Sequence, residues 1–245
     1  QVVGPDGNPV KRAVLFCSGD LMRPQDPGIR VVGFPGGNPG TGHAIEVRDG
    51  KFEVPGCNPN KKHRVFILDI SGEAAPERAG QFRLPATLPP LLANAKGRLG
   101  ASVELSAKPG NEPITVRLTP CGSAEVGVVD DKGKPAKANL WLEMIVTPAR
   151  GQGGPEWVTL GGPGEMYRPL ASPPLSRRGP QSANWALSAL RPGADGRLTI
   201  PALIPGATYR LRIFDARDLG VVRVEREFTV ESGKTRKLPD IVLAP

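Results

Sequence analysis

A segment in the first half of the chain recurs, at the same length, near its end. Asp49–Asp69 reads DGKFEVPGCNPNKKHRVFILD, and Asp195–Asp215 reads DGRLTIPALIPGATYRLRIFD, with the Asp, Gly, Pro, Pro, Arg, Ile and Asp residues in the same places. A shorter match supports this one, with VVGPDGNP at Val2–Pro9 and VVDDKGKP at Val128–Pro135. Because a repeated order of motifs is the signature of a duplicated unit, the sequence predicts two copies of one domain.

The composition favours strands over helices. The chain has 245 residues, which suits two domains of ordinary size, and these include 31 Gly and 28 Pro. Gly and Pro interrupt every candidate helix, so we expect no helix longer than about three turns. The apolar runs are short, rich in β-branched residues and bounded by turn residues, as in Ala13–Phe16, Val65–Leu68 and Val126–Val129. Such runs predict β-strands.

The repeat sets the domain limits. The first copy spans residues 1–120 and the second spans residues 121–245, with only Cys121, Gly122 and Ser123 as a linker, which predicts a restricted angle between the copies. Compared with the second copy, the first begins partway through its first strand, so we expect further residues before Gln1. The second copy carries a Gly- and Pro-rich insertion at about residues 148–194, and a long segment of this kind is usually functional or mobile.

Turn residues carry a resemblance to a known family. The second copy reads V-x-D-x-x-G-x-P-x-x-A, then D-G-x-L-x-I-P and P-G-x-x-Y-x-L, with these residues at Val128, Asp130, Gly133, Pro135, Ala138, Asp195, Gly196, Leu198, Ile200, Pro201, Pro205, Gly206, Tyr209 and Leu211. The first copy matches at Gly7, Pro9, Ala13, Asp49, Gly50, Phe52, Val54, Pro55 and Pro59, and has His63 where Tyr209 falls. This pattern resembles the carboxypeptidase regulatory-like domain family. The resemblance implies an all-β fold of two tandem seven-stranded antiparallel β-sandwiches, transthyretin-like or Ig-like. It also implies a non-catalytic accessory module of a bacterial surface or secreted protein.

The titratable residues suggest no enzyme. The two histidines, His43 and His63, stand in no nucleophile or general-base motif, so we predict no catalytic residues. Together with Cys17 and Cys57 they lack the close spacing of a metal knuckle, and no calcium-loop pattern occurs. We therefore predict no metal and no cofactor.

The net charge of +8 and the pI near 9.7 could indicate an anionic partner. However, the 32 Lys and Arg residues are spread along the chain, and aromatic residues are not interleaved with them as single-strand binders require. We expect no nucleic-acid binding. No apolar stretch approaches the roughly 20 residues that a membrane-spanning helix needs.

The chain has three cysteines. Cys57 and Cys121 each follow an expected strand, and we predict a disulfide between them, whereas Cys17 continues an apolar run and is expected to be buried. A disulfide fits an oxidising compartment, so we expect an extracytoplasmic location: periplasmic, at the cell surface or secreted. Free thiols in the cytoplasm are the alternative.

Two functions are compatible with these observations. The first is a non-catalytic spacer or assembly module of a larger bacterial extracytoplasmic protein, with protein partners or neighbouring domains. The alternative is a module that binds carbohydrate or another ligand through the aromatic residues of the insertion, which are Trp157, Tyr167 and Trp185. Exposed rings would favour ligand binding, whereas burial of the same rings would favour the spacer.

Overall fold

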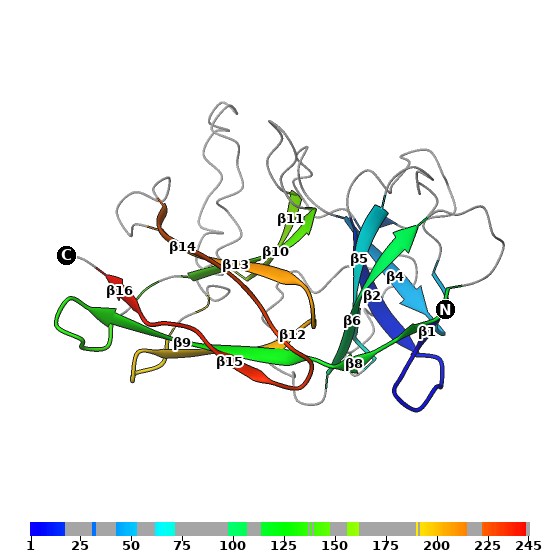
Figure 1. Cartoon of the computed structure of the whole chain (residues 1–245), viewed down its shortest axis with the longest axis horizontal. Helices are drawn as coiled ribbons and strands as arrows, with labels where there is room; N and C mark the ends of the chain where they lie inside the picture. The colour runs from blue at the N-terminus through cyan, green and yellow to red at the C-terminus, as the bar shows by residue number, and fades with distance from the viewer. Residues whose placement is uncertain are drawn as a thin grey trace, which may run out of the picture.

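The computed structural model describes residues 1–17, 31–32, 43–52, 62–71, 98–106, 114–136, 138, 140–147, 156–161, 190, 192–214 and 222–243. These residues form strands and turns, and none of them is helical (Figure 1). The all-β class predicted from the sequence is therefore confirmed. Within the same ranges, no helix has the length and apolar character needed to cross a membrane.

Most strands of the first half join one large sheet. Its order is β3-β4-β2-β5-β6-β8, formed by β3 (Val31–Val32), β4 (His43–Arg48), β2 (Arg12–Cys17), β5 (Lys62–Asp69), β6 (Leu99–Ser106) and β8 (Thr119–Pro120). A small parallel pair, β1 (Val2–Val3) with β7 (Val116–Arg117), lies apart from it.

The described strands of the second half form two sheets. One has the order β11-β10-β13-β14, from β11 (Glu156–Gly161), β10 (Leu140–Thr147), β13 (Thr208–Phe214) and β14 (Val222–Thr229). The other centres on β9 (Gly122–Asp130), which pairs with β12 (Arg197–Leu203), β15 (Thr235–Lys237) and β16 (Ile241–Leu243). Each half thus contributes eight described strands, which are grouped into sheets differently, and the expected seven strands in each copy are not confirmed.

The repeated motifs fold alike in the two halves. The Val2 amide donates to the Gly50 carbonyl at 2.7 Å, and the Val128 amide donates to the Gly196 carbonyl at the same distance. The parallel pairing of β1 with β7 is matched by that of β9 with β16. The sequence match therefore extends to matching backbone hydrogen bonds.

Glycine is required at the turn that follows each repeated Asp. Gly50 and Gly196 have φ angles of +68° and +73°, which only glycine adopts without strain. A Cβ atom would lie 2.6 Å from the Val2 carbonyl oxygen in the first case and 2.7 Å from that of Val128 in the second. Asp49 also has a positive φ, and Arg48 pairs with Lys51 across the turn, as in the two-residue hairpin that Asp-Gly predicts.

The central strands β2 and β5 of the large sheet are buried on both faces. Along β2, Ala13, Leu15 and Cys17 belong to a core within the first half. The alternate residues Val14 and Phe16 belong to a second core, which contains most of the buried residues of the second half. Successive side chains of a strand point to opposite faces, so β2 and its neighbour β5 separate two cores.

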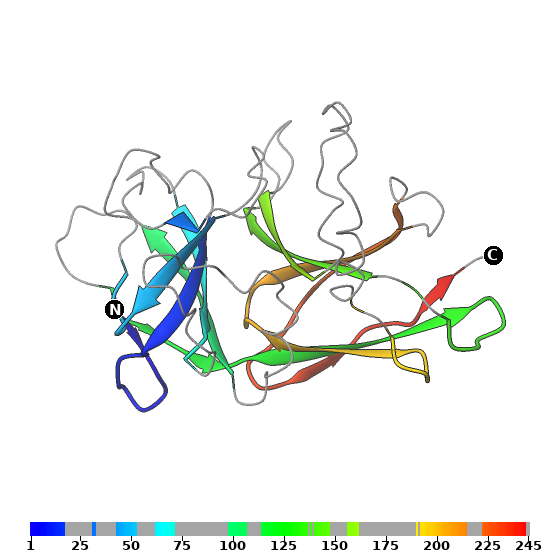
Figure 2. The same cartoon turned by 180° about the vertical axis from the view of Figure 1, so that it is seen from behind.

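We call the second face the back of the large sheet; its buried residues are Val14, Phe16, Phe66, Leu68 and Ile70. They pack in one continuous cluster with residues of the second half that include Met144, Val146, Leu203, Ile204 and Tyr209. In Figures 1 and 2, the large sheet stands across one end of the second half. The two halves therefore share a hydrophobic core.

The glycine turns lead to a first prediction. Gly196→Ala should lower the free energy of unfolding by about 3 kcal/mol, because the new methyl group would strain the left-handed backbone and would also overlap the Val128 carbonyl oxygen. The matched control is Gly133→Ala, where φ is +74° but a Cβ atom would meet no other atom within 4 Å. This control should lower the free energy of unfolding by only about 1 kcal/mol. Urea unfolding measures both, and equal losses would contradict the steric explanation.

Candidate functional site

The chain passes from one half to the other with almost no linker. β8 pairs with β6 in the large sheet, and β9 of the second half begins after the single residue Cys121. The Cys121 amide donates to the Arg98 carbonyl at 2.8 Å. From the second half, the Ser232 hydroxyl and the Gly233 amide donate to the Pro120 carbonyl at 2.9 and 3.1 Å. Both halves therefore hold this crossing, which is visible where β8 runs into β9 (Figure 1).

A turn of the second half packs closely on the first half beside this crossing. A Cβ atom on Gly206, whose φ is +75°, would lie 2.7 Å from the Ser102 hydroxyl oxygen of β6. A Cβ atom on Gly100 would lie 3.3 Å from Ile204 and 3.1 Å from the Cys121 sulfur. The absence of side chains at these two glycines allows the halves to approach this closely.

Tyr209 fixes the same turn from inside the core. Its hydroxyl oxygen accepts a hydrogen bond of 2.6 Å from the Ile204 amide, and its ring stacks on Phe228 with the centroids 5.6 Å apart. The ring is fully buried, and burial raises the pKa of the Tyr209 hydroxyl. The tyrosine of the family-like motif therefore has a structural role at the junction. His63, at the corresponding place in the first half, is also buried.

Cys121 carries a free thiol in the structure. Burial raises the pKa of this thiol to about 12, so it stays protonated at neutral pH and is a poor nucleophile. Cys57 lies outside the described residues, and the Cys57–Cys121 disulfide stays a prediction. Cys17 is buried in the core of the first half, as expected from the apolar run that precedes it.

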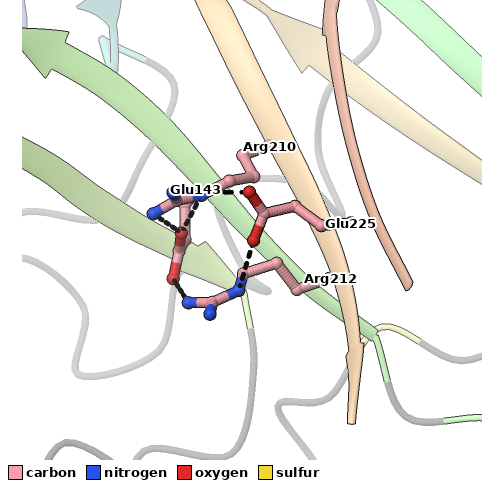
Figure 3. Close-up of polar contacts among 4 residues, drawn as sticks. All are labelled: Glu143, Arg210, Arg212 and Glu225. Atoms are coloured by element: carbon pink, nitrogen blue, oxygen red, sulfur yellow. Dashed lines mark hydrogen bonds and ion pairs between the residues drawn. The ribbon is translucent and has the colours of Figure 1, made fainter. Parts of the chain in front are cut away.

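A buried ion network occupies the second half, on the sheet that contains β10, β13 and β14 (Figure 3). The Arg210 Nε atom donates to Glu143 Oε2 at 2.7 Å, and Arg210 Nη2 lies 2.6 Å from the same oxygen. Arg212 Nη1 donates to the other Glu143 oxygen at 3.3 Å, and its Nε lies 3.2 Å from Glu225 Oε2. Arg210 Nη1 closes the ring at 3.7 Å from Glu225 Oε1.

Strand register assembles this network. Glu143 lies directly opposite Arg210 on neighbouring strands, and Arg212 lies opposite Glu225. Leu142 and Met144, on either side of Glu143, belong to the shared core, so the network lies on the other face of the sheet. The Glu143 side chain is 1% exposed and that of Glu225 is 42% exposed.

The chemistry of the network suits a structural role and not a catalytic one. It contains two carboxylates and two guanidinium groups, and each charge faces an opposite one. Such pairing satisfies buried charge but leaves neither carboxylate free to act as a base. This network was not predicted from the sequence, although a signal for it is present there: Glu143 interrupts an apolar run, and two arginines alternate with apolar residues in β13.

The predicted aromatic platform is only partly within the described residues. Trp157 lies in the edge strand β11, where it is the register partner of Ile145. Tyr167 and Trp185 lie outside the described residues, so the aromatic platform stays a prediction. Among the residues that are described, no group of three His, Cys, Asp or Glu side chains is arranged to hold a metal ion.

No protein-family model matches the chain, and neither does any curated protein. Similar solved structures include the TIE protein of Bacillus anthracis, with 11% identity and a TM-score of 0.27 over 97% of this chain and 35% of that one. A streptococcal ancillary pilin gives 14% identity and a TM-score of 0.27, over 98% of this chain and 60% of that one. The shaft pilin SpaA of Lactobacillus rhamnosus GG gives 9% identity and a TM-score of 0.29, over 96% of this chain and 84% of that one. The chain thus spans less than two thirds of the first two structures, and TM-scores this low carry no argument about function.

The ion network gives the second prediction. Glu143→Gln should lower the free energy of unfolding by about 3 kcal/mol, because it leaves the buried side of Arg210 without its counter-charge. Glu225→Gln is the matched control: it removes a carboxylate from the same network at a more exposed position, and should cost less than about 1 kcal/mol. Chemical denaturation measures both variants, and a smaller loss for Glu143→Gln than for the control would contradict the assignment.

Proposed function

We propose that this chain is a non-catalytic structural module, which serves as a rigid spacer or assembly unit of a larger extracytoplasmic protein. We further propose that it consists of two tandem copies of a transthyretin-like β-sandwich, related to the carboxypeptidase regulatory-like family and divided near residue 120. Its partners would be neighbouring domains or other protein subunits.

The shared core is the observation that carries this proposal. A flexible pair of domains would leave the back of the large sheet in water, yet Phe16 and Phe66 there are at most 1% exposed. Burying one such ring contributes about 1.5–3 kcal/mol, so separation of the halves would be costly. A module of this kind holds its two ends at a fixed distance and orientation, as a spacer must.

Further observations support two copies and a structural role. The turns at Gly50 and Gly196 have the same close approach to a carbonyl oxygen, as two descendants of one unit would. Among the described residues of the second half, the buried charges of Glu143, Arg210 and Arg212 are paired with one another. The extracytoplasmic location rests on the family resemblance and on the predicted Cys57–Cys121 disulfide. No observation on the described residues favours the carbohydrate-binding alternative.

Solution scattering tests the rigid-spacer proposal. Phe66→Asp places a carboxylate in the shared core and should separate the halves, which would increase the radius of gyration while circular dichroism still shows folded strands. The milder Phe66→Ala should give a smaller change in the same direction. Val242→Asp is the control, because Val242 is an apolar strand residue that is 58% exposed, and it should leave the scattering curve unchanged. If folded Phe66→Asp scattered like the parent chain, the shared core would not determine the arrangement.

A further inference from the structure

In each half, the first strand pairs in parallel with strands near the end of the same half. In the first half β1 pairs with β7, and Val2 lies opposite Val116. In the second half β9 pairs in parallel with both β15 and β16, and Val128 lies opposite Ile241. The other described strand pairs of the two halves are antiparallel. Parallel pairing is thus found where the chain enters and leaves each half.

The direction of the chain at these pairs determines how they respond to tension. From β7 the chain continues through β8 into β9, so it leaves the first half along the direction in which β1 runs. β16 leaves the second half at the far end of β9, where Leu243 lies opposite Asp130. The two marked ends of the chain lie at opposite ends of the molecule (Figure 1). Tension along the chain therefore pulls the two partners of each parallel pair in opposite directions along their length.

Tension of this kind loads backbone hydrogen bonds in shear. Each bond contributes only about 0.5–1.5 kcal/mol to stability, so resistance to force depends on how many bonds share the load. In shear, the bonds along a pair carry the force together, whereas a force across the pair breaks them one after another. β9 has three register pairs with β15 and three with β16, and all of them lie along the line of the force.

Further hydrogen bonds hold the partners of β9 in place. The Ser123 amide donates to the Lys234 carbonyl at 2.9 Å, and the Leu238 amide donates to the Glu125 carbonyl at 2.8 Å. The segment between β15 and β16 is held from the other sheet, because the Arg226 guanidinium donates to the carbonyls of residues 239 and 240 at 3.0 and 3.2 Å. These contacts extend the attachment of the final strands beyond their register pairs.

The parallel pair of the first half has matching bonds. The Val116 amide donates to the Gln1 carbonyl at 2.7 Å, and the Leu118 amide donates to the Val3 carbonyl at 2.9 Å. Residues 114–136, which join β7 to β9, all lie within the described part of the chain. The path of the force from one parallel pair to the next is therefore short and ordered into strands.

We propose that this chain bears tension along its length through two shear clamps, which are β1 with β7 in the first half and β9 with β15 and β16 in the second. The inference rests on the proposed function, because neighbouring domains or subunits of the larger protein would transmit the tension. It goes beyond a spacer of fixed length, since a rigid module need not resist a pulling force.

Single-molecule pulling on the full chain tests the clamp of the second half in two directions. Handles are attached at the C-terminus and, through an azide-bearing phenylalanine, at either Thr119 or Lys132, both of which are exposed. Force at Thr119 enters β9 at its start and slides β9 along β15 and β16. Force at Lys132, in the turn directly after β9, separates the adjacent ends of β9 and β16. The two proteins thus load the same hydrogen bonds in shear and across the pair.

At equal loading rate, the rupture force with the handle at Thr119 should be at least about twice that with the handle at Lys132, because forced unfolding follows the barrier along the direction of pulling. Equal forces, or a higher force at Lys132, would overturn the proposal. Scattering of Phe66→Asp tests the spacer separately: if that variant expands as expected while the rupture force is independent of direction, only the load-bearing inference fails.

Discussion

Burial of one apolar sheet face of the first half against the end of the second half holds the two halves of this chain together. Phe16 and Phe66 belong to β2 and β5 of the first half, yet their rings lie in the core of the second half. The direct passage from β8 through Cys121 to β9 keeps this contact intramolecular. The glycines at positions 100 and 206 then allow the close approach of the two backbones. Each of these features would have little purpose in two independent domains.

The two halves use equivalent sheet faces in opposite ways. Phe66 and Arg212 occupy the same place in the repeated segment. Phe66 packs into the shared core, whereas Arg212 belongs to the ion network with Glu143 and Glu225. An apolar face gains free energy from burial against another sheet, but a face of paired charges gains little from such burial. This difference explains why the back of the large sheet of the first half, and not the corresponding face of the second half, forms the contact between them.

Local features were predictable from the sequence, and long-range ones were not. The Asp-Gly pair at positions 49–50 is a local signal for the two-residue hairpin found there, because turn geometry depends on adjacent residues alone. The uninterrupted apolar run Val65–Leu68 also carried a signal of burial on both faces, but nothing local indicated which surface would cover it. The ion network was missed because it requires the register between Glu143 and Arg210, residues that are far apart in the chain. Tyr209 was identified only as a motif residue, since its hydrogen bond to Ile204 depends on the folded turn.

If the two halves form one cooperative unit, tryptophan fluorescence from the second half should report destabilisation of the first half. All three tryptophans, Trp141, Trp157 and Trp185, lie in the second half, whereas Leu15 lies in the core of the first half, on the face away from the second. Leu15→Ala should lower the free energy of unfolding by about 2–5 kcal/mol. Coupling through the shared core predicts that the urea midpoint measured by tryptophan fluorescence falls together with the midpoint measured by circular dichroism. An unchanged fluorescence midpoint, with an earlier separate transition in circular dichroism, would show that the two halves unfold independently.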